Sequence, residues 1–220
     1  MKQNNVLILC IAFLSCVFST KNVHAQSVGI TAGVNFQNIT GKNAKNETMK
    51  NSLVPKFAAG LNVDLMLAPD YYIQPGVLFA MKGAKSEDGA TKINLTYVEI
   101  PVNFIYKPKL NEGSILLGFG PYVGIGIGGK VKSTGIERTV EYKKTITAAD
   151  FINVSKVYFA PIDAGINFLA GYEFARGLSF QLNAQLGLIK INPTISGNSS
   201  DKTSLKNTGF GVSLGYRFGR

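Results

Sequence analysis

A period-two alternation of apolar with small or polar residues constrains this chain more than any other feature of its sequence. The last segment shows it clearly, with apolar side chains at Phe210, Val212, Leu214, Tyr216 and Phe218. Because successive side chains of a β-strand point to opposite faces, each such segment presents one apolar and one polar face. The pattern predicts strands near residues 28–36, 57–67, 71–82, 93–107, 115–127, 162–174, 178–188 and 210–218.

The connections between these segments alternate in length. Those at 68–70, 108–113 and 175–177 are short, whereas the others are longer and polar, at 37–55, 83–91, 133–156 and 192–206. Short turns at one end, long loops at the other and an even strand number are typical of outer-membrane barrels. We therefore predict an all-β fold, an eight-stranded antiparallel up-and-down transmembrane β-barrel with short periplasmic turns and longer extracellular loops.

Two irregularities interrupt the alternation. The apolar parity slips in residues 93–107. Leu95 and Tyr97 are odd-numbered, whereas a second apolar set is even-numbered, at Val98, Ile100, Val102, Phe104 and Tyr106. A β-bulge near residues 97–101 accounts for this slip. Prolines cannot donate a ladder hydrogen bond, so we also expect bulges where they fall in the strand regions. These prolines are Pro75, Pro101, Pro121 and Pro161.

Alternation alone does not say which face meets lipid, and a secreted lipocalin-like barrel with its apolar face inward is the alternative. The polar faces carry mainly Gly, Ser, Asn and Gln, which favours a polar lumen and an apolar, lipid-facing outer wall. Aromatic residues cluster near the short turns, which predicts a periplasmic aromatic girdle at the membrane interface. Its members are Tyr71, Tyr72, Tyr106, Tyr172, Phe174, Tyr216 and Phe218.

The first 25 residues have the pattern of a secretory signal peptide. Lys2 precedes an apolar run over residues 6–18, and a small-x-Ala site ends at Ala25. This leaves residues 26–220 as the barrel domain. Lipid attachment at Cys16 is the alternative, but the bulky Leu14 disfavours it. Cleavage removes both cysteines and the only histidine, which excludes thiol nucleophiles, Ser-His-Asp triads and histidine metal sites. We expect no cofactor and no metal.

The inward-facing parity gathers charged residues. Because eight strands enclose a lumen just wide enough for side chains, and because buried charges need partners, we predict a structural lumen charge network. Its members are Asp64, Glu99, Lys107, Lys130, Asp163, Glu173 and Arg217. The alternative is a gated ion path or ligand site. The one carboxylate pair suited to acid–base hydrolysis, Asp64 with Glu173, is interpreted as structural, so we do not expect an enzyme.

Four short motifs resemble the PorT-like outer-membrane β-barrel family of Bacteroidetes. They are Tyr97-Val98-Glu99-Ile100-Pro101, Gly120-Pro121-Tyr122-Val123-Gly124, Asp163-Ala164-Gly165 and Gly215-Tyr216-Arg217-Phe218. The likeness covers most of the mature chain and accommodates two of the awkward prolines. It implies a barrel in the outer membrane of a Gram-negative bacterium, and one branch of the family implies a role in protein secretion. Many outer-membrane proteins end on an aromatic residue, whereas here Gly219-Arg220 follow Phe218.

The formal net charge of +10 raises the question of an anionic partner. The basic residues are scattered and have no aromatic stacking platform beside them, so we do not expect nucleic acid. The expected partners are outer-membrane lipid and lipopolysaccharide, the barrel-assembly machinery during insertion, and envelope proteins. The predicted function is a structural or interaction role in the cell envelope. The alternatives are a narrow channel, a small-ligand binder or a secretion-associated barrel.

Overall fold

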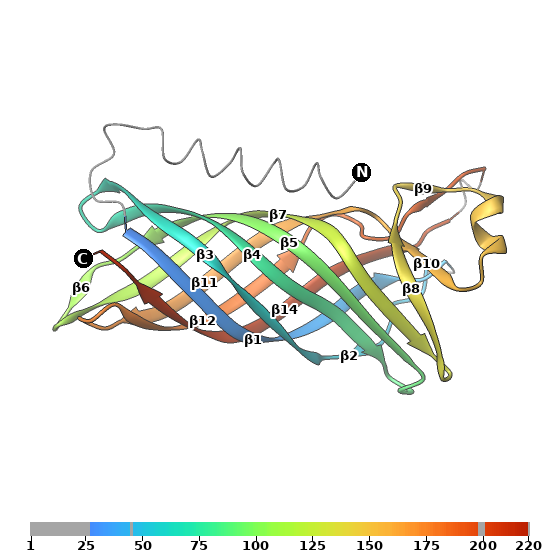
Figure 1. Ribbon diagram of the computed structural model, residues 1–220, viewed down its shortest axis with the longest axis horizontal. Coiled ribbons are helices and arrows are strands. Elements are labelled where there is room, and N and C mark those ends of the chain that lie inside the picture. Colours follow the sequence, from blue (N-terminus) through green and yellow to red (C-terminus); the bar gives the residue numbers. More distant parts are fainter. Residues whose placement is uncertain (1–26, 45, 198–200, 220) are drawn as a thin grey trace.

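The computed structural model describes residues 27–44, 46–197 and 201–219, and over these residues the chain forms a closed barrel of eight antiparallel strands (Figure 1). Each barrel strand pairs with the next in chain order, and β14 pairs with β1 to close the ring. The barrel strands are β1 (Ser27–Lys42), β3 (Val54–Ala68), β4 (Tyr71–Ser86), β5 (Thr91–Tyr106), β7 (Gly113–Ser133), β11 (Ile162–Glu173), β12 (Leu178–Gly187) and β14 (Ser204–Arg217). The predicted fold class is confirmed, while the predicted signal peptide lies outside the described residues.

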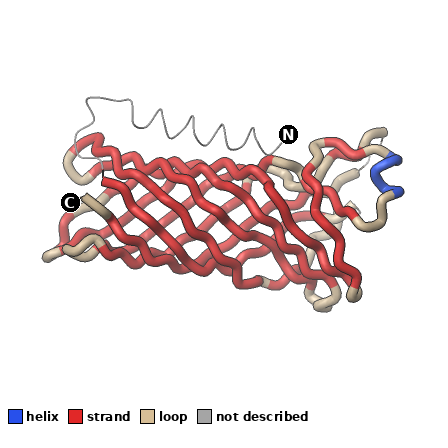
Figure 2. Tube along the Cα trace, in the orientation of Figure 1, coloured by secondary structure: helices blue, strands red, loops and turns tan. Residues whose placement is uncertain are grey.

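Smaller secondary-structure elements lie at the two ends of the barrel. At the short-turn end β6 (Lys109–Leu110) pairs with β7. The elements of the long-loop end are β2 (Asn51–Ser52), β8 (Ile136–Tyr142), β9 (Thr145–Ile146), the 3-10 helix η1 (Ala148–Ile152), β10 (Lys156–Phe159) and β13 (Thr194–Ile195). Figure 2 shows that, in the described chain, helix is confined to one turn at the far long-loop end.

The barrel strands extend further into the long-loop end than the alternation predicted. β4 continues to Ser86 and β5 begins at Thr91, so a tight turn replaces the loop expected over residues 83–91. Cross-strand pairing continues there although the outer face has become polar, since it depends on backbone hydrogen bonds as well as on an apolar face.

The barrel wall is apolar on its outside. Leu61, Phe168 and Leu214 are 53%, 50% and 58% exposed, and they belong to a band of exposed aliphatic and aromatic residues that continues round the strands. A lipocalin-like barrel would bury this set inside, so the outward orientation is confirmed. None of the helices in the described chain is long and apolar enough to cross a membrane.

The ladder between β5 and β7 contains one β-bulge. Thr96 pairs with Gly128, and Tyr97 pairs with Gly126. Ile127 of β7 is therefore the extra residue, and the bulge that was predicted on β5 lies on the opposite strand. An extra residue shifts the two-residue period by one, so the bulge also reverses which side chains of β7 face the lumen.

On β5 a single parity is kept along the whole strand. Leu95, Tyr97 and Glu99 are all buried and all point inward. The apolar pattern slips in this strand because the inward positions near the long-loop end are themselves apolar, and not because the strand is bulged.

The in-strand prolines are accommodated by gaps in the ladders. Pro101 borders a gap between β5 and β7, and Pro121 lies within that gap. A similar gap follows Pro75 between β4 and β5. The register is the same on both sides of each gap, so the bulges expected at these prolines were wrong. Pro161 lies just before β11. Leaving a few residue pairs without ladder hydrogen bonds disturbs the strand less than a bulge does, because all the remaining side chains stay on their own face of the sheet.

The buried apolar core of the molecule lies at the long-loop end. It is built from inward residues of the barrel together with residues of β8, of β10 and of the loop that follows β12, and we call this group the outer plug. Its buried members are Ile39, Ala84, Leu95, Tyr97, Val131, Val140, Phe159 and Ile191. The outer mouth of the lumen is therefore filled by side chains.

Tyr142, the last residue of β8, attaches the outer plug to the bulge. Its hydroxyl donates to the carbonyl oxygen of Gly128 at 3.0 Å and lies 3.4 Å from that of Thr96. Its ring occupies the space beside Gly126, where a Cβ atom would lie 2.2 Å from the ring. The bulge thus supplies both the acceptors and the room for this side chain.

Candidate functional site

Two layers of buried ion pairs cross the lumen. The lower layer lies at the short-turn end and joins Asp64, Lys107, Glu173 and Arg217. The Lys107 ammonium lies 3.3 Å from Asp64 Oδ2 and 2.9 Å from Glu173 Oε2. Arg217 Nη2 lies 2.9 Å from Asp64 Oδ1. Two cations therefore balance two carboxylates, as burial of these four groups requires.

Amide side chains complete the lower layer. Gln74 Nε2 donates to Asp64 Oδ1 at 2.7 Å, and Arg217 Nη1 donates to Asn62 Oδ1, also at 2.7 Å. Below this layer a cavity of about 530 Å³ opens at the short-turn mouth, where Tyr72 and Lys107 are among its lining residues.

The upper layer is centred on Lys82 of β4, which is 1% exposed. Its ammonium lies 2.5 Å from Glu99 Oε1 and 2.8 Å from Asp163 Oδ2. The same ammonium lies 4.3 Å from the centroid of the Tyr122 ring, within the range of a cation–π contact. Asn207 Nδ2 also donates to Asp163 Oδ2, at 2.9 Å. Among the described residues, Lys82 is thus the lysine that pairs with both Glu99 and Asp163.

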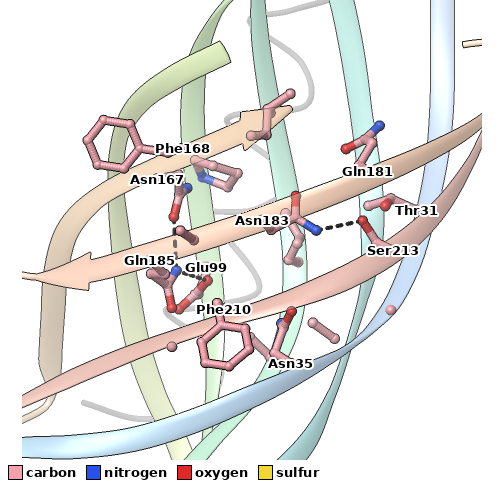
Figure 3. A pocket seen from close by; sticks show the side chains of 18 of the residues that line it. Thr31, Asn35, Glu99, Asn167, Phe168, Gln181, Asn183, Gln185, Phe210 and Ser213 are labelled. Carbon is pink, nitrogen blue, oxygen red and sulfur yellow. Dashed lines mark hydrogen bonds between the residues drawn. The ribbon is translucent and has the colours of Figure 1, made fainter. Parts of the chain in front are cut away.

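Amide and hydroxyl side chains line the middle of the lumen (Figure 3). Gln185 Nε2 donates to Glu99 Oε2 and to Asn167 Oδ1, each at 3.1 Å. Asn183 Nδ2 donates to Ser213 Oγ at 2.7 Å. The cavity in this part of the lumen measures about 110 Å³. Typical pockets for small organic ligands are larger, at roughly 300–1,000 Å³.

Six of the seven residues predicted for the lumen network lie in these layers. Asp64, Lys107, Glu173 and Arg217 meet in the lower one, and Glu99 and Asp163 meet in the upper one. The four residues expected to share a layer near the short turns therefore lie together.

Lys130 is the exception, and its placement in the lumen was wrong. Its side chain is 64% exposed and lies 2.6 Å from Glu137 Oε1, outside the barrel. The bulge at Ile127 is the physical reason, because it turns the even-numbered residues beyond it outward.

The predicted aromatic girdle lies mostly on the outer wall at the short-turn end. The rings of Tyr71 and Tyr106 stack with their centroids 4.9 Å apart. Edge-to-face pairs join Tyr172 to Phe174 and Tyr216 to Phe218.

Tyr72 is a correction to the predicted girdle. It alternates with Tyr71 and points into the short-turn mouth, where the Lys107 ammonium lies 5.5 Å from the centroid of its ring.

Sequence reasoning missed two buried lysines, Lys82 and Lys56. Lys82 shares its parity with Gln74 and Ala80, which face the lumen, and this parity was the available signal. The Lys56 ammonium donates to the side-chain oxygen of Asn94. That contact joins strands that are not neighbours, and no local pattern predicts it.

The lumen contains few groups suited to catalysis. Its carboxylates are engaged by lysine, arginine and amide donors, so none is free to act as a base toward a substrate. In the part of the chain that the structure describes, no group of three or more His, Cys, Asp or Glu side chains is arranged to hold a metal ion.

A closed eight-stranded sheet with an apolar outer wall and an ion-paired, polar lumen is a transmembrane β-barrel. A family model described as outer membrane protein beta-barrel domain matches residues 19–192, and the chain belongs to that family. The outer wall therefore faces the lipid of the outer membrane, the short turns face the periplasm and the long loops face outward.

Several solved structures are similar to this chain, among them the following two. One is Ail, the attachment invasion locus protein of Yersinia pestis, in complex with the heparin analogue sucrose octasulfate. It is 12% identical with a TM-score of 0.42, over 88% of this chain and 99% of Ail. The other is Neisserial surface protein A, which is 10% identical with a TM-score of 0.48, over 89% of this chain and all of that protein. No curated protein matches the sequence.

Proposed function

We propose that this chain is a non-conducting outer-membrane barrel with a structural or interaction role in the cell envelope, and that it is not an enzyme. The observation that carries this proposal is the filled lumen. An ion reaching the lower layer meets Lys107 and Arg217 already paired, then the Lys82 pairs, and finally the apolar outer plug. An ion would therefore find no continuous polar route through the described barrel.

Conductance measurements test this proposal against the narrow-channel alternative. The folded protein is reconstituted into a planar bilayer, after its heat-shifted migration on a gel has verified the barrel. We expect no unitary current steps from the wild type. The variant Leu95→Ala/Phe159→Ala, which thins the outer plug, controls for sensitivity to leakage. Discrete steps from the wild type would overturn the proposal and favour a channel.

The outward-facing loops are the parts available to partners. The loop that contains η1 exposes Phe151, Ile152 and Val154, which are 58%, 81% and 77% exposed, at the end of the molecule farthest from the periplasmic turns (Figure 1). Large exposed apolar residues are typical of contact surfaces. They support an interaction role with other envelope components over a purely structural one.

The finer identity and the cellular location also belong to this proposal. Three residues of the motifs that resemble the PorT-like family are members of the two ion-paired layers, namely Glu99, Asp163 and Arg217. Their ion pairs support a structural role for those motifs.

We also propose that the protein is exported through a cleaved signal peptide and inserted by the barrel-assembly machinery. If so, the mature protein begins at Gln26 and is found in the outer-membrane fraction. N-terminal sequencing of that fraction, with a heat-modifiability gel, tests both. Recovery in the soluble periplasm would contradict them.

A further inference from the structure

Three lysines lie directly opposite one another on three adjacent strands. Lys85 of β4 pairs with Lys92 of β5, and Lys92 pairs in turn with Lys132 of β7. All three are exposed, and they face outward, on the lipid side of the wall. We call them the lysine row. Directly opposed side chains have Cβ atoms about 5 Å apart, and like charges in that position are destabilising. The row therefore favours an anion between or beside its members.

Within the described chain the row has no carboxylate as an ion-pair partner, although Glu137 adds negative charge near Lys132. Among the described residues, no ion pair joins Lys85, Lys92 or Lys132 to a carboxylate. Glu137 lies opposite Lys132, but its carboxylate binds Lys130 at 2.6 Å. In the turn above the row, Asp88 accepts hydrogen bonds from the Ser86 hydroxyl and the Ala90 amide.

A fourth cation adds to the positive charge near the row. The Lys56 ammonium donates to the side chain of Asn94, which is two residues from Lys92 on the same face of β5. Figure 1 shows the β4–β5 and β7–β8 turns side by side at the lower right, and the Thr134 amide of one donates to the Ala90 carbonyl oxygen of the other at 3.0 Å.

The height of the row matches the headgroup region of the outer leaflet. Lys85 and Lys92 each lie fourteen residues from the periplasmic girdle, at Tyr71 and Tyr106 of their strands. At about 3.3 Å per residue and a strand tilt of about 40°, this separation is about 35 Å along the membrane normal. The apolar band of such a barrel is about 25 Å tall. The lysines therefore lie about 10 Å beyond its outer edge.

The wall below the row is suited to acyl chains. Phe79 of β4 and Ile127 of β7 are 48% and 42% exposed on the same outer face. A single amphiphile can therefore place its chains on this wall and its phosphate at the lysines.

We propose that Lys85, Lys92 and Lys132 form a binding site for the phosphate groups of an outer-leaflet lipid of the lipopolysaccharide type. The site depends on the position of the barrel in the outer membrane. It does not depend on whether the lumen conducts, so a failed conductance test would leave it standing.

The test uses the full mature chain folded in a neutral detergent. Three probes are titrated: purified lipopolysaccharide, the same lipid after removal of its phosphates, and inorganic pyrophosphate. Native mass spectrometry counts retained probe, and the midpoint temperature of heat-dependent gel migration reports stabilisation. The test variant is K85Q/K92Q/K132Q. The matched control is K144Q/K190Q/K202Q, which removes the same charge from loop lysines that have no ion pair within the described chain.

We expect the wild type and the control to retain phosphorylated lipid, and the row variant to bind it about a hundredfold more weakly. Each lysine beside an anionic lipid surface contributes roughly a factor of five. Without lipid we expect the row variant to melt at the same temperature as the wild type or higher, because repulsion is relieved. If the row served only to stabilise the fold, the row variant would melt at a lower temperature than the wild type.

Other outcomes overturn the proposal. Equal weakening in both triple variants would show that bulk charge attracts the lipid. Equal binding of the phosphate-free lipid would show that the acyl chains alone are recognised. Saturable binding of pyrophosphate as tight as that of the lipid would assign the row to a soluble phosphate.

Discussion

Lys82 and Asp163 stand on strands that are not neighbours, and the ammonium of Lys82 lies 2.8 Å from Asp163 Oδ2 across the lumen. Both side chains are buried, at 1% and 0% exposure. The same ammonium also meets Glu99. One lysine is therefore the cationic partner of two carboxylates that are buried away from water.

Replacing Lys82 by methionine should destabilise the folded barrel by about 3–5 kcal/mol, the usual cost of leaving buried charge without its partner. The free energy of unfolding is measured in urea with the barrel in detergent. The triple variant K82M/E99Q/D163N removes all three charges and should recover most of that loss. If the triple variant is as unstable as the single one, packing of Lys82 and not its charge is what matters.

Removing Arg217 tests the lower layer. Arg217→Ala leaves Asp64 with Lys107 as its one cationic partner in the described layer, so we expect a lower unfolding temperature in detergent by several degrees. Arg176, an exposed arginine of the nearby β11–β12 turn, provides the matched control, and Arg176→Ala should leave the melting temperature unchanged. An unchanged melting temperature for Arg217→Ala would count against a shared layer.

The attachment of the outer plug depends on the missing side chain of Gly126. Gly126→Ala places a Cβ atom 2.2 Å from the ring of Tyr142, so that ring must move and its hydroxyl must leave the Gly128 carbonyl oxygen. The loop over residues 134–161 should then become more sensitive to trypsin. Gly128→Ala is the control, because its Cβ atom would meet nothing within 4 Å. Equal cleavage rates in the two variants would contradict this account of the plug.

The loop that presents η1 should loosen in acid. The Lys143 ammonium and then the Thr147 amide hold the pKa of Asp150 below its ordinary value of 3.8. A lowered folded-state pKa contributes stability that is complete above the unfolded value and is lost as the pH falls through the folded one. Amide exchange at Thr147 should therefore accelerate, relative to Asp150→Asn, only below about pH 4. A difference that persists unchanged to pH 2 would contradict this.

The strand pattern and the outward apolar set could be read from the order of residues, because the two-residue period is local. Phe168 and Leu214 face lipid as their parity predicted. The lower layer was also accessible, since Asp64 and Arg217 lie near predicted short turns and so had to occupy one end of the lumen.

Which side chains contact one another across the barrel could not be read from the local pattern, because it depends on how the strands pair. The bulge at Ile127 moved Lys130 to the outside, and the pairing of distant strands brought Lys82 to Asp163. The lysine row likewise exists only in the cross-strand register. Parity assigns a side chain to a face, but its neighbours on that face belong to other strands. Their identity follows from register, and register is set when the whole sheet closes.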